Sequence, residues 1–361
     1  MRVSLCVRDF LSRVVVATLA AGVAMGQQEY ELQLLRHLPK IAPDLEFRHV
    51  RVRWIRSSLP GEARLPLRVL PRLPRAVQLM ASRYAYGAAD VVHRNDFRLP
   101  PGRNEVVTVH DLASLRFADE GTIPPGADAA LRRAKAIICP SQFAASELAS
   151  VFGIENATVI YNGLDPAVWL PAPHPQPTST LPSRFVLHSG GSTKRKNLRA
   201  LAEAWTHLAA LQPDVELVMC GPPHPRRDAL FDHLPRVRKL GRVQRTEHLA
   251  LMRAATVVVI PSIYEGFGFP ALEAMALGTA VVAARSASLP EICGDAALLV
   301  PPTGDGIGAG LVQVLTDQEL RNDLEFRGPT RAQGFTWEKS ARLHAEVFRS
   351  VSGKAGRPQT F

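Results

Sequence analysis

With 361 residues, of which 46% are hydrophobic, the chain can form two domains with separate cores. Its four cysteines, at positions 6, 139, 220 and 293, show neither a CxxC pattern nor metal-ligand spacing, which is typical of reduced thiols in a cytosolic protein. The net charge is +10, and no apolar run reaches the roughly 18 to 20 residues that a membrane-spanning helix requires.

The N-terminal region is predicted to form a strand, a glycine loop and a helix. Three valines at 14–16 are followed by Gly22, Gly26 and an apolar pattern of helical spacing that starts at Tyr30. A basic start, a short apolar run and small residues also resemble a signal peptide. We favour the strand–loop–helix interpretation, which leaves residues 1–12 as an extension of unknown purpose.

Residues 48–83 carry nine arginines and a single acid, Glu62, so most of the positive charge lies there. The segment also contains apolar residues that could lie on anionic lipid, among them Trp54, Leu65, Leu67, Leu70, Leu73 and Met80. A solvated arginine-rich face is the alternative. Nucleic-acid binding ranks below both, because no nucleic-acid motif accompanies the charge and four prolines prevent one long basic helix.

Short strands followed by polar residues indicate a parallel α/β domain in the first half. They are predicted at 90–93, 105–110 and 136–139, and sites in doubly wound sheets form at the carboxyl ends of such strands. His110 ends one of these strands, within the sequence ThrValHisAsp. A lone histidine is more often structural than catalytic, but this position makes His110 a candidate.

The domain boundary is predicted at a proline-rich stretch. Residues 165–182 contain six prolines and no glycine, a composition typical of a semi-rigid linker. We therefore divide the chain into an N-terminal domain (1–165), a linker (166–183), a C-terminal domain (184–335) and a final helix with a tail (336–361). The second half alternates strands and helices, which predicts a second doubly wound domain.

A phosphate site is predicted where the strand 185–188 ends in SerGlyGlySerThr. Lys194, Arg195 and Lys196 follow directly, so glycine flexibility at Gly191 and three cations meet at one strand end. This is not a Walker loop, because GxxxxGK[ST] is missing. The alternative is a set of basic residues at a helix start, exposed to water.

The stretch PSIYEGFGFPALEAMALGTAVVA at 261–283 is the most informative one. A β-branched strand (256–260) precedes it, and Pro270 suits the first turn of a helix that begins near Phe269 and closes at Gly278. Carboxylates then flank the helix start, where free N–H groups favour an anion. Glu265 could face a sugar and Glu273 a ribose. Alternatively, Glu273 interacts only with its own helix.

The chain resembles the retaining GT-B glycosyltransferases of family 4 (glycosyl transferases group 1), in particular bacterial mannosyl- and glucosyltransferases of polysaccharide assembly. The segments that carry the resemblance occur in the order of the family: TVHDLASLRF (108–117), ICPSQFAASEL (138–148), VIYNGLD (159–165), the segment 185–205 with KRKN, VRKLGRV (237–243) and 261–283. The resemblance implies two doubly wound Rossmann-like domains that face a cleft, with a last helix that crosses back to the N-terminal domain.

The same resemblance implies roles for individual residues. The catalytic candidates are Glu265 on the sugar hydroxyls, Lys196 on the diphosphate, and His110 beside the donor sugar. The candidates for donor binding are Gly26, Gly191, Arg195, Arg242, Val243, Gly266, Phe267, Gly268, Phe269 and Glu273. The arginine that many members carry just after the glycine of the strand is absent, because Gly191 or Ser192 stands there.

The expected donor is a GDP- or UDP-sugar, with GDP-mannose favoured, and the expected acceptor is a glycan or a lipid-linked hydroxyl. No DxD motif occurs in the chain, so we expect no cofactor and no metal, with helix N-termini and Lys196 as counter-charge. We expect a cytoplasmic protein, peripheral on the membrane if residues 48–83 bind it. A nucleotide-sugar epimerase, a non-catalytic sugar-nucleotide-binding protein and a basic adaptor remain the alternatives.

Overall fold

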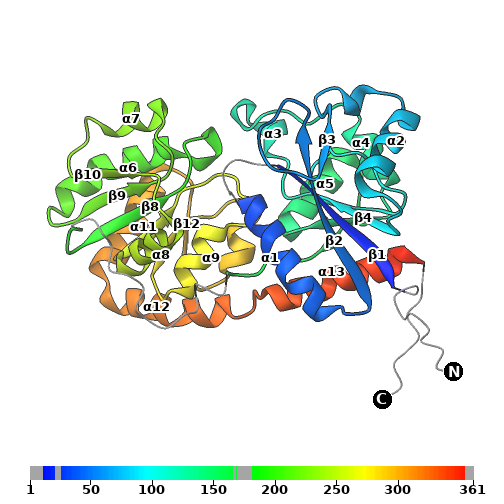
Figure 1. Cartoon of the computed structure of the whole chain (residues 1–361). Coiled ribbons are helices and arrows are strands. Elements are labelled where there is room, and N and C mark those ends of the chain that lie inside the picture. Colours follow the sequence, from blue (N-terminus) through cyan, green and yellow to red (C-terminus); the bar gives the residue numbers. More distant parts are fainter. Residues whose placement is uncertain (1–10, 21–25, 166–167, 169–180, 354–361) are drawn as a thin grey trace, which may run out of the picture. The chain divides into compact units, whose positions relative to one another are not determined.

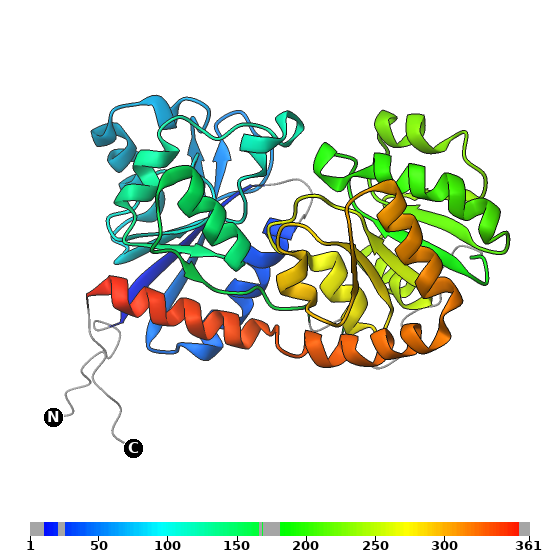
Figure 2. The same cartoon turned by 180° about the vertical axis from the view of Figure 1, so that it is seen from behind.

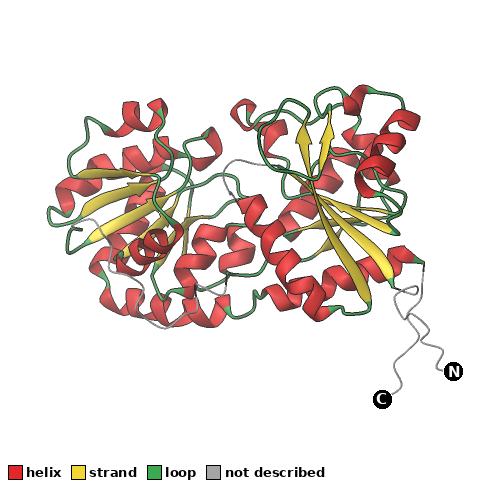
Figure 3. Ribbon diagram, in the orientation of Figure 1, coloured by secondary structure: helices red, strands yellow, loops and turns green. Residues whose placement is uncertain are grey.

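The computed structural model describes residues 11–20, 26–165, 168 and 181–353, and these divide into two compact units. The first unit comprises the described residues of Met1–Leu112, Thr122–Gly163 and Thr336–Phe361, and the second comprises Ala113–Gly121 and those of Leu164–Phe335. Each unit has its own sheet of parallel strands, drawn in yellow in Figure 3. The prediction of two doubly wound parallel-sheet domains is therefore confirmed.

The units differ from the sequence division at Ala113–Gly121 and at Leu164 and Asp165, which belong to the second unit. Ala113–Gly121 groups with the second unit, although it precedes the predicted linker by more than forty residues of chain. The linker (166–183) falls mostly outside the described residues, as do Cys6, Gly22 and residues 1–10.

The first unit contains a seven-stranded sheet in the order β3-β2-β1-β4-β5-β6-β7, and every neighbouring pair is parallel. The elements of this unit, many of them labelled in Figure 1, are β1 (Ser12–Leu19), α1 (Gly26–Ile41), β2 (Leu45–Trp54), β3 (Ala63–Leu65), η2 (Leu70–Arg72), α2 (Arg75–Tyr86), β4 (Val91–Arg94), β5 (Glu105–Thr108), α4 (Ala127–Arg133), β6 (Ala136–Cys139), α5 (Gln142–Phe152), β7 (Thr158–Val159) and α13 (Trp337–Ser352).

The N-terminal region forms the strand and helix that the valine run predicts. β1 is a central strand, its valines at 14–16 are buried, and α1 begins at Gly26. The last helix, α13, packs against α1 within the same unit (Figure 1). The predicted strand and helix are therefore confirmed, while the predicted loop with Gly22 lies outside the described residues.

The arginine-rich segment corrects one expectation. Leu65, Leu67 and Leu70 belong to the buried core of the first unit, so these side chains do not lie on lipid. The sequence reasoning overlooked β2, in which Val50 and Val52 are buried while arginines alternate with them toward solvent. Only a part of the apolar side chains in 48–83 remains exposed.

The second unit contains a six-stranded parallel sheet in the order β10-β9-β8-β11-β12-β13. Its elements are α3 (Ala113–Arg116), η3 (Ala118–Glu120), β8 (Phe185–Ser189), η5 (Lys194–Lys196), α6 (Leu198–Leu211), β9 (Glu216–Cys220), α7 (Pro225–Phe231), β10 (Val237–Gly241), α8 (Arg245–Ala254), β11 (Val257–Ile260), α9 (Phe269–Ala276), β12 (Val281–Ala284), α10 (Leu289–Cys293), β13 (Leu298–Val300), α11 (Gly304–Thr316) and α12 (Gln318–Ala332).

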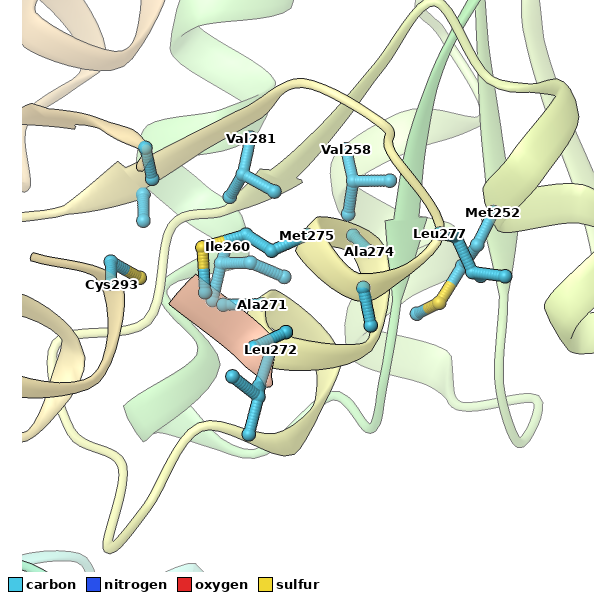
Figure 4. Close-up of a cluster of buried hydrophobic side chains, with 14 of the residues drawn as sticks. Met252, Val258, Ile260, Ala271, Leu272, Ala274, Met275, Leu277, Val281 and Cys293 are labelled. Atoms are coloured by element: carbon cyan, nitrogen blue, oxygen red, sulfur yellow. The ribbon is translucent and has the colours of Figure 1, made fainter. Parts of the chain in front are cut away.

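Two cores cover the two faces of this sheet. Successive side chains of a strand point to opposite faces, so Val258 and Ile260 join one core while Val257 and Val259 join the other. Helices α6 and α11 pack together over one face, as the view from behind shows (Figure 2). On the other face, Ala271, Leu272 and further residues of α9 pack onto β11 and β12 (Figure 4).

The strand order determines where a ligand site can form. Strand order reverses between β8 and β11, because the chain first extends the sheet through β9 and β10 and then returns to the other side of β8. In open parallel sheets, ligands bind outside the carboxyl ends of strands at such a switch point. A ligand site is therefore expected at the loops that follow Ser189 and Ile260.

Candidate functional site

Glu265 forms ion pairs with two residues of the KRKN segment. Its Oε1 lies 2.6 Å from Lys196 Nζ, and its Oε2 lies 3.0 Å from Arg195 Nη1. Burial alone would raise the pKa of Glu265, but the charges of Lys196 and Arg195 outweigh burial and lower it to about 2. The two segments that carried the sequence argument therefore meet in the second unit, seventy residues apart along the chain.

Hydrogen bonds fix the loop that carries Glu265. Ser288 Oγ donates to the carbonyls of Glu265 and Phe267, both at 2.9 Å. Asn197 Nδ2 donates to the carbonyl of Pro261 at 3.0 Å, and Asn197 adopts a positive φ of 54°. Asparagine tolerates this left-handed conformation better than most residues, which explains its place between η5 and α6.

The helix α9 begins where the sequence predicts. Gly268 precedes Phe269 with a φ of +104°, which glycine adopts without strain, and Pro270 lies in the first turn. No side chain caps this N-terminus. The arrangement places the positive end of a helix dipole beside the Glu265 loop, and such an end attracts anions. At the other end, Gly278 has a φ of +72°.

Glu273 lies on α9 and pairs with a residue that the sequence reasoning did not assign. Arg245 Nη2 lies 2.7 Å from Glu273 Oε1, and Arg245 Nε lies 3.7 Å from Asp165 Oδ2. Beside this pair, His248 Nε2 and Ser189 Oγ are 2.6 Å apart. The predicted ribose carboxylate is thus buried and linked to the first residue of α8.

Three further predicted donor residues follow the strands β8 and β10, which lie on either side of β9 in the sheet. Gly191 follows β8, and a Cβ atom placed on it would meet no atom within 4 Å. Arg242 and Val243 follow β10; Arg242 is exposed, while Val243 packs against the core.

Sequence reasoning missed two buried polar residues of the phosphate loop. His188, at the end of β8, is fully buried; burial first and then the charges of Arg227 and Lys196 lower its pKa to about 3. Arg227 of α7 donates to the carbonyl of Gly190 at 2.5 Å and to that of Gly221 at 3.2 Å. The strand-end position of His188 was a usable signal, whereas nothing in the spacing points to Arg227.

The first unit contains the other two predicted residues. Gly26 is the first residue of α1. His110 lies two residues beyond β5, and its ring stands edge-on to Tyr30 with centroids 4.7 Å apart. Burial, with a smaller contribution from the neighbouring His344, lowers the pKa of His110 to about 4, so its imidazole is neutral at pH 7.

No group of three His, Cys, Asp or Glu side chains that could hold a metal occurs among the described residues. Within the same part of the chain, none of the helices combines the length and apolarity needed to cross a membrane. The cysteines at 139, 220 and 293 are buried and free, and burial raises the pKa of Cys139 and Cys293 to about 12.

Comparison with known protein families gives two matches that together span most of the chain. Residues 13–168 match the model described as Glycosyltransferase Family 4, and residues 174–331 match the model described as Glycosyl transferases group 1. The O-antigen chain mannosyltransferase B of Escherichia coli is 30% identical over 317 residues, which cover 78% of this chain and 81% of that protein. The phosphatidyl-myo-inositol mannosyltransferase of Mycolicibacterium smegmatis is 33% identical over 227 residues, 59% of this chain and 58% of that protein.

Solved structures share the fold at lower identity. Sucrose-phosphate synthase from Thermosynechococcus elongatus has a TM-score of 0.72 at 22% identity, and the match covers 94% of this chain and 99% of that one. Anabaena HepE, solved in complex with UDP and glucose, has a TM-score of 0.70 at 18% identity and covers 93% of this chain and 99% of that one.

Proposed function

Because this chain belongs to the group 1, family 4 glycosyltransferases, we propose that it transfers a hexose, with mannose favoured, from a nucleoside-diphosphate sugar to a hydroxyl of a glycan or a lipid-linked acceptor. The preference for mannose rests on the mannosyltransferases among its relatives. In this proposal the second unit binds the nucleotide sugar and the first unit selects the acceptor.

One observation carries the proposal: the buried carboxylate of Glu265 is held by Lys196 and Arg195 beside the uncapped N-terminus of α9. A paired carboxylate accepts hydroxyl hydrogen bonds in a fixed geometry, which suits the hydroxyls of a sugar. The ammonium of Lys196 and the helix dipole suit the negative charge that a departing diphosphate develops. A binding protein needs the first of these features but has no departing diphosphate for the second to stabilise.

The other residues divide the nucleotide among them. Glu273 accepts hydrogen bonds from the hydroxyls of the ribose. The backbone at Arg242 and Val243 lies beside the base. Amide groups of the loop from Gly266 to Phe269, together with Gly191 in the loop after β8, approach the diphosphate closely because glycine has no side chain in the way. We assign to Gly26 a contact with the phosphates and to neutral His110 a hydrogen bond to the donor sugar.

The reaction proceeds with retention at the anomeric carbon. The bond between C1 and the diphosphate oxygen breaks, and the acceptor oxygen forms its bond to C1 on the same face. The proton of the acceptor hydroxyl passes to the departing phosphate oxygen. Nothing in this scheme needs a nucleophile from the protein, which agrees with the ion-paired state of Glu265.

We further propose that transfer needs no divalent metal, because Lys196 and the N-terminus of α9 supply counter-charge to the diphosphate. Lys196 and the N-terminus of α9 can replace a metal ion as counter-charge only if both contact the phosphate oxygens. Their joint loss should therefore abolish transfer.

A docking surface for anionic membrane is proposed on α2 and the end of η2. Val77, Met80 and Tyr84 expose 40%, 69% and 67% of their surfaces, and the exposed Arg72 and Arg83 flank them. This mixture suits a cytoplasmic protein that lies peripherally on the membrane. Sedimentation with vesicles of anionic lipid tests the idea: the double variant Met80→Glu, Tyr84→Glu should stay in the supernatant, and equal sedimentation of variant and wild type would refute it.

The function itself is tested by release of UDP or GDP from a panel of UDP- and GDP-hexoses, with and without candidate acceptor glycans. We expect turnover of one donor by the wild type and a large loss in Glu265→Gln, which keeps the shape of the side chain but not its charge. Glu319→Gln, an exposed change on α12, is the matched control and should keep full activity.

Each alternative predicts a different result. An epimerase converts the donor into a free or epimerised sugar without any acceptor product. A binding protein retains nucleotide without turnover of any donor. An adaptor that works through the arginine-rich segment is indifferent to the change at Glu265.

A further inference from the structure

A buried polar cluster in the first unit links α13 to the neighbourhood of His110. Tyr30 of α1, His93 of β4 and His344 of α13 are each at most 1% exposed, and Thr108 of β5 lies between them. Tyr30 Oη is 2.7 Å from His344 Nε2 and 3.2 Å from Thr108 Oγ1, and Thr108 Oγ1 is 2.8 Å from His93 Nε2. Polar groups buried this deeply are costly unless paired, so their retention asks for a reason.

The direction of the hydrogen bonds follows from one end of the chain of groups. His344 Nδ1 lies 2.8 Å from the carbonyl of Ser340, and a carbonyl only accepts, so Nδ1 carries the hydrogen. Burial lowers the pKa of His344 to about 4, so the ring is neutral and its Nε2 is an acceptor. Tyr30 must then donate its hydroxyl hydrogen to His344.

The remaining bonds are determined in turn. With its hydrogen engaged, the Tyr30 oxygen accepts from the Thr108 hydroxyl, and the Thr108 oxygen accepts from His93 Nε2. His93 Nδ1 has no partner among the described residues. All hydrogens therefore point one way, toward α13, and the phenol of Tyr30 is held through both its donor and its acceptor functions.

The ring of Tyr30 packs directly against the imidazole of His110. The two ring planes are 81° apart with centroids at 4.7 Å, an edge-to-face contact. On its other sides, Tyr30 contacts Trp337 and His344 of α13, with centroids at 5.9 and 5.8 Å. The phenol is fixed at its oxygen and packed against Trp337 and His344, so the Tyr30 ring keeps one orientation and gives the imidazole of His110 a fixed edge-to-face neighbour.

His110 Nε2 has no partner among the described residues although it is buried. We infer that Tyr30, held by His344, is a positioning residue that presents the imidazole of His110 to a hydroxyl of the donor sugar. The inference rests on the proposed function for the identity of the hydroxyl. It gives the last helix of the chain a part in the site, through two side chains that do not touch the substrate.

The test is a double-mutant cycle between Tyr30→Phe and His110→Ala, with kcat and donor KM measured for each variant. Tyr30→Phe keeps the ring and removes the hydroxyl alone. We expect it to lower kcat about tenfold with donor KM unchanged, and to have no further effect once His110 is alanine. Equal factors in both backgrounds would overturn the inference.

Two further variants separate positioning from folding. Tyr86→Phe removes another buried hydroxyl of the same unit, which donates to the carbonyl of Pro100 at 3.1 Å. It should destabilise the protein as Tyr30→Phe does but leave kcat at the wild-type value; an equal fall in kcat would show that Tyr30 acts only through stability. His344→Gln offers an amide oxygen to Tyr30 and should restore most of the kcat that His344→Leu loses.

A spectroscopic readout keeps the inference testable if no donor is turned over. In protein with 15N-labelled histidine, the imidazole signals of His110 are assigned by their absence in His110→Ala. Tyr30→Phe and His344→Leu should shift and broaden these signals, whereas Tyr86→Phe should not. Unchanged signals in the first two variants would refute the positioning role, whereas an inactive wild type with shifted signals would refute the proposed function alone.

Discussion

The guanidinium of Arg245 lies 2.7 Å from the carboxylate of Glu273. Arg245 is therefore paired with the same carboxylate that we propose as the ligand of the ribose hydroxyls. The side chain of Glu273 is 10% exposed and that of Arg245 is 37% exposed. The arginine can therefore swing toward solvent while the carboxylate keeps its place. Nucleotide binding then exchanges an arginine contact for hydroxyl contacts at the same oxygens.

Replacing Glu273 by glutamine should weaken donor binding. A hydrogen bond to a charged group contributes about 1.5–3 kcal/mol, so we expect the donor KM to rise about 10- to 100-fold with kcat nearly unchanged. Initial rates over a range of donor concentrations measure both constants, with Glu319→Gln as the control. A fall in kcat at constant KM would contradict the assignment to the ribose.

Lys196→Ala should affect the chemical step more than binding. The ammonium faces a charge that grows as the diphosphate departs, and one preorganised donor to such a charge is typically worth about a hundredfold to a thousandfold in kcat. The adjacent Lys194 is exposed, so Lys194→Ala is a matched control that should keep the wild-type rate. Single-turnover measurements separate the rate constant of the chemical step from the dissociation constant of the donor. Equal losses of rate in Lys196→Ala and Lys194→Ala would mean that only the total charge matters.

Removal of divalent metal should leave transfer intact. We expect rates in EDTA and in magnesium to agree within about a factor of two, since Lys196 and the N-terminus of α9 act as counter-charge. The donor that the wild type turns over is the substrate for this comparison. Activity that vanishes in EDTA and returns with magnesium would refute the metal-independent mechanism.

The buried histidine of α13 should make the protein less stable in acid. Burial lowers the pKa of His344 from 6.5 to about 4, so its contribution is full above pH 6.5 and is lost as the pH falls through 4. Between pH 7 and pH 4, the free energy of unfolding of the wild type should fall by about 3 kcal/mol more than that of His344→Gln. Urea unfolding of both proteins at each pH measures the difference, and parallel curves would refute it.

Gly163→Ala should destabilise the first unit. A Cβ atom on Gly163 would lie 2.2 Å from the backbone nitrogen of Trp337, and backbone atoms cannot give way as a flexible side chain does. We expect a loss of about 1–3 kcal/mol or more in the free energy of unfolding. Gly191→Ala, which would meet open space, should change stability little. Similar losses in both variants would point to a general cost of replacing glycine.

Local sequence patterns predicted those helices and strands whose apolar spacing or end residues are visible in their own segment of the sequence. The range of α6 and that of β6 follow directly from apolar spacing, and the start of α9 follows from Pro270 and the glycine before it. β2 was not predicted, because its segment was interpreted by its arginine content and not by the alternation of Val50 and Val52 with polar residues. Charge and periodicity are separate signals, and here the first obscured the second.

The site divides in the same way. Motifs identified Glu265 and Lys196 as site residues, but no spacing rule states that the two side chains bond across seventy residues of chain. The pairing of Arg245 with Glu273 and the cluster around Tyr30 depend on which strands and helices become neighbours. Such contacts follow from topology, which short-range patterns leave open.

The placement of α13 in the first unit has a consequence for biosynthesis. His344, the partner of Tyr30, emerges from the ribosome more than three hundred residues after it. Domains generally fold as units while the chain is being made, so the second unit can complete its core during translation whereas the first must wait for the last helix. A chain that ends before residue 337 and has left the ribosome should therefore carry a finished second unit and an open first unit, with Tyr30 accessible to chaperones.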